Sequence, residues 1–126
     1  MDFPTDLRYS DQHEWVRIDD RRVMVGITDY AQDALGDVVF VELPQLGTTV
    51  ARGTRVCEIE STKSVSDIYA PVSGTIVEVN GALADAPELV NSEPYGSGWM
   101  FSIDAEDVSE LDELMDGTQY RSFVEQ

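Results

Sequence analysis

Lys63 is the only lysine of this 126-residue chain, and it lies in the short run Glu60-Ser61-Thr62-Lys63-Ser64. A primary amine is a nucleophile, and an exposed one can be joined to another group. On a rigid support, such an amine can carry that group on a swinging arm between several binding sites. The residue type and its isolation therefore suggest a lysine that is loaded covalently.

The residues on both sides of Lys63 predict a β-hairpin with the lysine at its tip. Residues 47–60 and 65–79 contain alternating β-branched positions, and turn residues stand at Gly53 and at 71–74. Both turns lie about ten residues from Lys63, which is the spacing expected for two strands that meet at the lysine. A tip position leaves the amine exposed.

The chain offers few other groups for chemistry. Its single cysteine, Cys57, shares a strand face with Ile59, so a buried structural thiol is the favoured interpretation. Its single histidine, His13, excludes a histidine-rich metal site and is better explained by local hydrogen bonding or packing. The sequence contains no nucleophile elbow, phosphate-binding glycine loop or dinucleotide fingerprint. We therefore predict no catalytic residues, no metal site and no enzymatic activity.

The remaining pattern predicts a mainly β protein. A short helix is expected over 28–36, with Thr28 as its cap and Gly36 at its end. The stretch 80–95 predicts a loop with one helical turn, and an acidic helical segment is expected from about 105 to 126. Besides the hairpin, strands are expected at 14–18, 23–27, 37–43, 75–79 and 99–103.

These elements predict one domain, residues 1–126, built as a flattened barrel or sandwich of two antiparallel sheets. Its hairpin core spans about 37–79, and its C-terminal helices lie in the acidic segment from about 105 to 126.

The composition limits the classes of partner that this protein can bind. With 25 acidic residues against eight basic ones the formal charge is −17, so nucleic acids and anionic membranes would repel the protein. The sequence shows no membrane span and no signal peptide, which predicts a cytoplasmic protein. The acids are spread along the chain and arginine replaces lysine, a pattern that we interpret as adaptation to a salty prokaryotic cytoplasm. An acidic docking surface for basic partners is a compatible alternative.

Specific motifs then indicate a family. The Gly-x-x-Val-x-x-Gly run before Lys63 and the Ala70-Pro71-x-x-Gly74 run after it resemble biotinyl and lipoyl carrier domains. Biotin carriers of this type usually have methionine on both sides of the lysine, whereas Thr62 and Ser64 are the neighbours here, which disfavours biotin. Nearly the whole chain resembles the H-protein family of the glycine cleavage system, through residues 13–16, 26–32, 35–44, 60–64, 66–67, 71–74 and 91–100.

This resemblance implies a non-catalytic carrier with lipoate joined to Lys63 by an amide bond. Its partners would be a pyridoxal-phosphate glycine decarboxylase, a tetrahydrofolate-dependent aminomethyltransferase, a flavin-dependent dihydrolipoamide dehydrogenase and a lipoate-attaching enzyme. The lipoyl arm would accept the aminomethyl group from the first and deliver it to the second. Two alternatives remain open: a lipoate or octanoate relay protein of the same fold, and a biotin carboxyl carrier domain.

Three acids are further candidates for the site. The aminomethyl-loaded arm would end in an ammonium, and a cleft that shelters it needs a carboxylate, for which Glu14 or Asp67 is the candidate. Glu60 is the candidate for recognition by the lipoate-attaching enzyme. An ordinary solvated acid is the alternative interpretation for each, in a chain with 25 acids.

Overall fold

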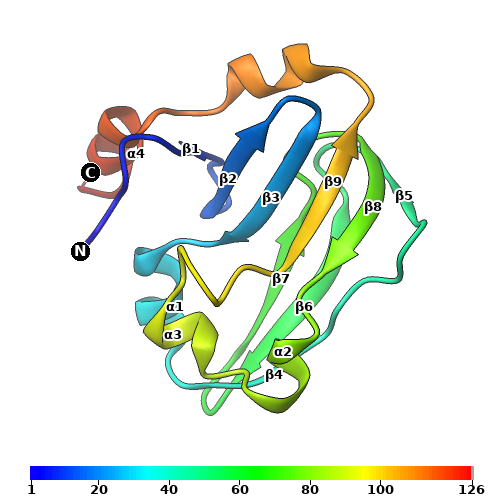
Figure 1. Cartoon of the computed structure of the whole chain (residues 1–126). Coiled ribbons are helices and arrows are strands. Elements are labelled where there is room, and N and C mark those ends of the chain that lie inside the picture. Colours follow the sequence, from blue (N-terminus) through cyan, green and yellow to red (C-terminus); the bar gives the residue numbers. More distant parts are fainter. Residues whose placement is uncertain (126) are drawn as a thin grey trace.

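The computed structural model describes residues 1–125, which form two antiparallel sheets with short helices around their ends (Figure 1). The strands are β1 Arg8–Tyr9, β2 Glu14–Asp19, β3 Arg22–Ile27, β4 Val38–Val41, β5 Thr49–Val50, β6 Arg55–Ser61, β7 Val65–Tyr69, β8 Gly74–Val79 and β9 Phe101–Ala105. The helices are α1 Asp29–Leu35, α2 Ala82–Asp85, α3 Leu89–Ser92, the 3-10 helix η1 Val108–Glu113 and α4 Gly117–Glu125.

The six-stranded sheet has the order β1-β2-β3-β9-β8-β5, and the three-stranded sheet has the order β4-β6-β7. Alternate residues of both sheets meet in one apolar core, which includes Val25 and Ile103 from the larger sheet and Ile59 and Ile68 from the smaller. The predicted sandwich of two antiparallel sheets, with helices at the C-terminal end, is confirmed. The last residue of the predicted acidic helical segment, 126, lies outside the described residues.

Cys57 belongs to this core, as its strand pattern predicts. Its side chain is fully buried, and burial raises the pKa of its thiol to about 12. A thiol in that environment stays protonated at neutral pH, so it packs as a small apolar group and is a poor nucleophile.

Helix α1 forms as the sequence predicts. The hydroxyl of Thr28 accepts a hydrogen bond from the backbone N–H of Ala31 at 3.1 Å, which caps the first turn. Gly36 ends the helix with φ at 90°, in a region that side chains with a Cβ rarely adopt. This glycine turns the chain directly into β4, which places the end of α1 beside the hairpin tip.

The C-terminal part differs from the prediction in two respects. The last strand runs over Phe101–Ala105 rather than 99–103, because pairing with β8 continues as far as Ala105 opposite Gly74. The acidic helix begins later, at Val108, and is a 3-10 helix; the side chain of Asp107 caps it by accepting from Ser109 N at 3.0 Å. The two-residue strands β1 and β5 were not predicted, since so short a segment shows no periodicity.

Candidate functional site

The structure places Lys63 at the tip of the β6–β7 hairpin, with its side chain exposed. The turn closes through a hydrogen bond from Ser61 N to Ser64 O at 2.8 Å. The hydroxyl of Ser61 accepts from Lys63 N at 3.2 Å and from Ser64 N at 3.0 Å. Thr62 N also donates to Asp37 O at 3.0 Å, which ties the tip to the start of β4. These bonds fix the backbone of the tip, so the motion of a group on Lys63 would come from its side chain.

A small open cavity of about 260 Å³ lies beside the tip. It runs between α1 and the start of β7, and its wall includes Ser64 and Val65, the two residues after Lys63. The rest of its surface is mostly apolar, with Ile27, Ala31, Leu35, Ile59 and Ile68. An apolar surface next to a loaded lysine suits a flexible hydrocarbon arm, since folding the arm back removes it from water.

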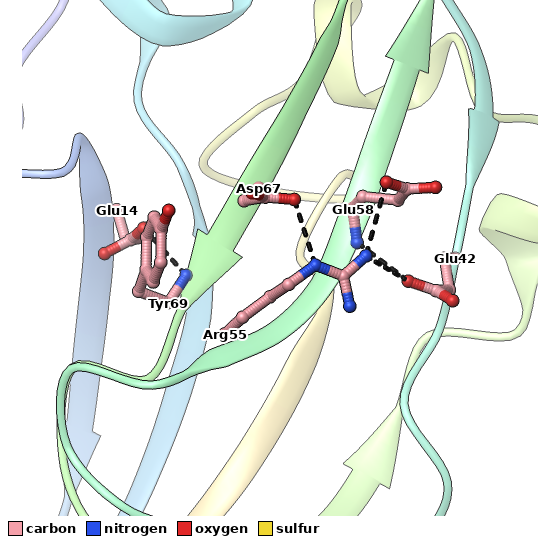
Figure 2. Close-up of polar contacts among 6 residues, drawn as sticks. All are labelled: Glu14, Glu42, Arg55, Glu58, Asp67 and Tyr69. Atoms are coloured by element: carbon pink, nitrogen blue, oxygen red, sulfur yellow. Dashed lines mark hydrogen bonds and ion pairs between the residues drawn. The ribbon is translucent and has the colours of Figure 1, made fainter.

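Glu14 lies in the wall of a second, larger cavity of about 630 Å³. Only 1% of Glu14 is exposed. Its carboxylate accepts hydrogen bonds from the hydroxyl of Ser10 at 2.5 Å and from the backbone N–H of Tyr69 at 3.2 Å, the latter drawn in Figure 2. Burial raises the pKa of Glu14 to about 7, although both hydrogen bonds act in the opposite direction. The group can therefore accept a cation by losing its proton near neutral pH.

The segment between the two cavities is held in an unusual conformation. Gln12 lines both cavities, and His13 has a positive φ of 68°. Its ring nitrogen Nδ1 lies 2.7 Å from the hydroxyl of Tyr120, which is also 2.8 Å from the hydroxyl of Thr28. This confirms the interpretation of His13 as a hydrogen-bonding residue. The network joins α4, the cap of α1 and the segment that leads into Glu14.

Asp67 is placed differently from Glu14. Its carboxylate accepts from Arg55 Nε at 3.0 Å, and Glu42 and Glu58 each lie 3.2 Å from the same guanidinium. Figure 2 shows the Asp67 carboxylate directed at Arg55 and away from Glu14. Of the two candidates for the arm cleft, only Glu14 lines one of the two cavities, and Asp67 is engaged in an ion pair on the outer surface.

Glu60 lies on the outward face of β6, half-buried, directly opposite Phe40 on β4 and Val65 on β7. It stands three residues before Lys63, so it forms part of the surface next to the tip.

Sequence reasoning missed two residues that shape the site. Ser10 bonds the Glu14 carboxylate, and its hydroxyl also accepts from Glu14 N at 3.1 Å. A serine before the short polar run 11–13 is a local turn signal that could have indicated it. Tyr120 was placed only on a helix; its contact with His13 joins residues 107 positions apart, which no local pattern reveals.

In the part of the chain that is described, residues 1–125, no helix is long and apolar enough to cross a membrane.

A two-sheet β domain that presents one lysine at an exposed hairpin tip belongs to the architectural class of the lipoyl and biotinyl carrier domains.

Comparison with known proteins narrows this class. The model of the family "Glycine cleavage H-protein" matches residues 7–126. The chain is 52% identical to the glycine cleavage system H protein of Brevibacillus brevis over 100% of both chains, and 55% identical to that of Thermus thermophilus over 99% of this chain and 98% of the relative. A crystal structure of the H protein from Mycobacterium marinum superposes with a TM-score of 0.90 at 43% identity, covering 98% of this chain and 99% of that one. The chain belongs to the glycine cleavage H-protein family.

Proposed function

We propose that this protein is the lipoyl-carrying shuttle of a glycine cleavage system, with lipoate joined by an amide bond to Nζ of Lys63. The observation that carries the proposal is the position of the single lysine on a fixed, exposed hairpin tip in a chain of this family. The protein is a carrier without catalytic residues of its own. The partners are the glycine decarboxylase, the aminomethyltransferase, the dihydrolipoamide dehydrogenase and a lipoate-attaching enzyme.

The residues around Lys63 fit such an arm. When attached, the dithiolane of lipoate supplies the chemistry, by taking up the aminomethyl group and by cycling between disulfide and dithiol. The protein supplies position: a fixed turn keeps Lys63 in solvent, where each partner can reach it in turn. The apolar cavity at Ser64 and Val65 gives a resting place to the hydrocarbon part of the arm.

Glu14 is the group that we propose to hold the ammonium at the end of a loaded arm. It is buried, lines the larger cavity and retains hydrogen bonds that favour its ionised form. A buried carboxylate that gains a cationic partner recovers part of the cost of its desolvation. Asp67 could serve this role only by giving up its bond to Arg55, which makes it the weaker candidate.

The acid excess supports a further proposal, that the protein works in the cytoplasm of a salt-adapted prokaryote. A formal charge of −17 on 126 residues destabilises a compact domain unless ions screen it. At about 1 M salt the Debye length is about 3 Å, and neighbouring carboxylates then repel one another only weakly.

The experiment that tests the carrier function is the intact mass of protein isolated from its native host, followed by peptide mapping. A lipoyl adduct on the peptide that contains Lys63, and its loss in a Lys63→Arg variant, would establish the attachment. A biotinyl mass would assign the protein to carboxylase chemistry instead. An unmodified Lys63 in cells that lipoylate other proteins would overturn the proposal.

The role of Glu14 is tested separately. Once the arm is loaded with the aminomethyl group, Glu14→Gln should shorten the lifetime of that group in the absence of acceptor, whereas Asp67→Asn should change it less. Equal lifetimes for the parent and both variants would exclude a carboxylate clamp at either position.

A further inference from the structure

An exposed apolar surface lies next to the lysine, on the outer face of the three-stranded sheet. The pairing of β4 with β6 shifts between Val38 and Phe40, and Val39 and Phe40 are consequently both exposed, by 52% and 51%. Val65 is 58% exposed. Phe40, Glu60 and Val65 are cross-strand partners, so they form one row across β4, β6 and β7. Large apolar side chains grouped on a surface commonly mark a contact with another protein.

A row of carboxylates follows on the same face, one step further from the tip. Glu58 pairs with Asp67, and Glu42 N donates to Glu58 O at 3.0 Å. Figure 2 shows their side chains gathered around Arg55, the only basic group of this cluster. With Glu60, this face carries four carboxylates against one guanidinium. We name the surface formed by Val39, Phe40, Glu42, Glu58, Glu60, Val65 and Asp67 the tip face. A complementary surface has an apolar centre and basic residues at its edge.

The position of the tip face indicates which of the proposed partner enzymes would contact it. In the proposed function, glycine decarboxylase, the aminomethyltransferase and the dehydrogenase act on the far end of the arm, so their active sites need not reach Nζ of Lys63. The enzyme that attaches the arm must bring its active site to Nζ of Lys63 itself. Its surface must then cover the residues beside the tip, and the Phe40–Glu60–Val65 row begins two residues after Lys63.

We propose that the tip face is the docking surface for the acylating enzyme, which meets it with an apolar patch bordered by arginine and lysine. This inference rests on the proposed lipoylation of Lys63. In the reaction, the Lys63 amine attacks the acyl carbon of a lipoyl adenylate; the amide bond forms, AMP leaves and the nitrogen loses a proton. The small cavity beside α1 shares only Val65 with the tip face, so the rest of its lining stays available to the arm.

The test is a steady-state acylation assay with a lipoate–protein ligase, lipoate and ATP, in which the concentration of the whole carrier is varied. Phe40→Ser and Val39→Ser remove apolar surface from the tip face and leave every residue of the small cavity unchanged. The matched control is Leu46→Ser, which removes a side chain that is 63% exposed in the connection between β4 and β5. We expect the KM for the carrier to rise about tenfold in the double variant, which corresponds to about 1.4 kcal/mol of binding, with kcat within about twofold. Leu46→Ser should behave as the parent.

Each result decides the question. A KM equal to that of the parent would overturn the docking surface, while acylation of Lys63 in the same assay would leave the carrier function intact. A parent that is not acylated at Lys63 would overturn both. If the substitutions left acylation unchanged and slowed only the exchange reaction of glycine decarboxylase, the tip face would be assigned to that enzyme and the proposal would be contradicted. If Phe40→Ser does not fold, Val39→Thr alone preserves the shape of the side chain and is compared with the parent and with Leu46→Ser in the same assay.

Discussion

The aliphatic stem of Lys63 lies against Gly36: a Cβ added at residue 36 would come within 3.0 Å of Lys63 Cε. The glycine that ends α1 therefore also provides room for the only lysine. Residues 27 positions apart in the sequence thus share one small region of space, at the junction of the helix, β4 and the hairpin tip.

Gly36→Ala tests the backbone requirement at this junction. The φ of 90° at Gly36 is costly for alanine, whereas the end of the lysine chain is flexible and can move aside. We expect the free energy of unfolding to fall by at least about 1 kcal/mol in urea titrations. Gly81→Ala is the matched control, since Gly81 has φ of −61° and open space around its Cβ position. Equal effects at both positions would contradict the explanation.

Glu14 should make stability depend on pH in an unusual direction. Its pKa rises on folding from 4.5 to about 7, mainly through burial, so the folded protein holds this proton more tightly than the unfolded chain. Its contribution to stability is consequently present at low pH and lost as pH rises through that interval, by up to about 1.4 kcal/mol per pH unit.

Comparison with Glu14→Gln isolates this contribution, because glutamine does not titrate. Relative to the parent, the variant should gain stability from pH 5 to pH 8 in denaturant titrations at intermediate pH values. Glu106→Gln, at an exposed carboxylate, is the control. A parent and a Glu14→Gln variant with parallel pH profiles would show that Glu14 has its ordinary pKa.

Tyr120→Phe should loosen the segment that leads into Glu14. The substitution keeps the ring stacked on Tyr9, at 4.6 Å between centroids, but removes the hydroxyl that meets His13 and Thr28. The buried Thr28 and the half-buried His13 each lose a hydrogen bond, and we expect the free energy of unfolding to fall by about 1 to 3 kcal/mol.

Hydrogen exchange would show which segment is destabilised in Tyr120→Phe. Faster exchange of Thr28 N, which donates to His13 O at 3.1 Å, is expected in Tyr120→Phe. Tyr69→Phe removes a hydroxyl from a half-buried tyrosine outside the network and serves as the control. Unchanged protection at Thr28 in Tyr120→Phe would rule out a role for the network in holding this segment.

Arg55→Gln should make stability more dependent on salt. Without the guanidinium, Glu42, which follows β4, faces Glu58 on β6 and Asp67 on β7 with no cation between them. We expect a lower melting temperature than the parent at low ionic strength and a difference that shrinks towards about 1 M KCl, where the charges are screened. Arg22→Gln, which removes a cation with a single partner, Glu78, should show a smaller dependence.

Local patterns in the sequence determined much of this protein. Alternating β-branched residues predicted the hairpin, and the turn residues on both sides placed Lys63 at its tip, because strand pairing and turn geometry depend on neighbouring residues. Thr28 and Gly36 marked the ends of α1 for the same reason.

The tertiary structure decided which acids can act. From the sequence, Glu14 and Asp67 are equally good candidates for the carboxylate that holds the ammonium. In the structure, Glu14 is buried against Ser10 and Tyr69, whereas Asp67 is bound to Arg55 on the outer surface. Burial and pKa depend on groups that are distant in the sequence, such as Tyr69, 55 positions from Glu14. The cavities beside the hairpin and the contact of Tyr120 with His13 likewise arise only when sheet, helix and chain end pack together, since no run of neighbouring residues encodes them.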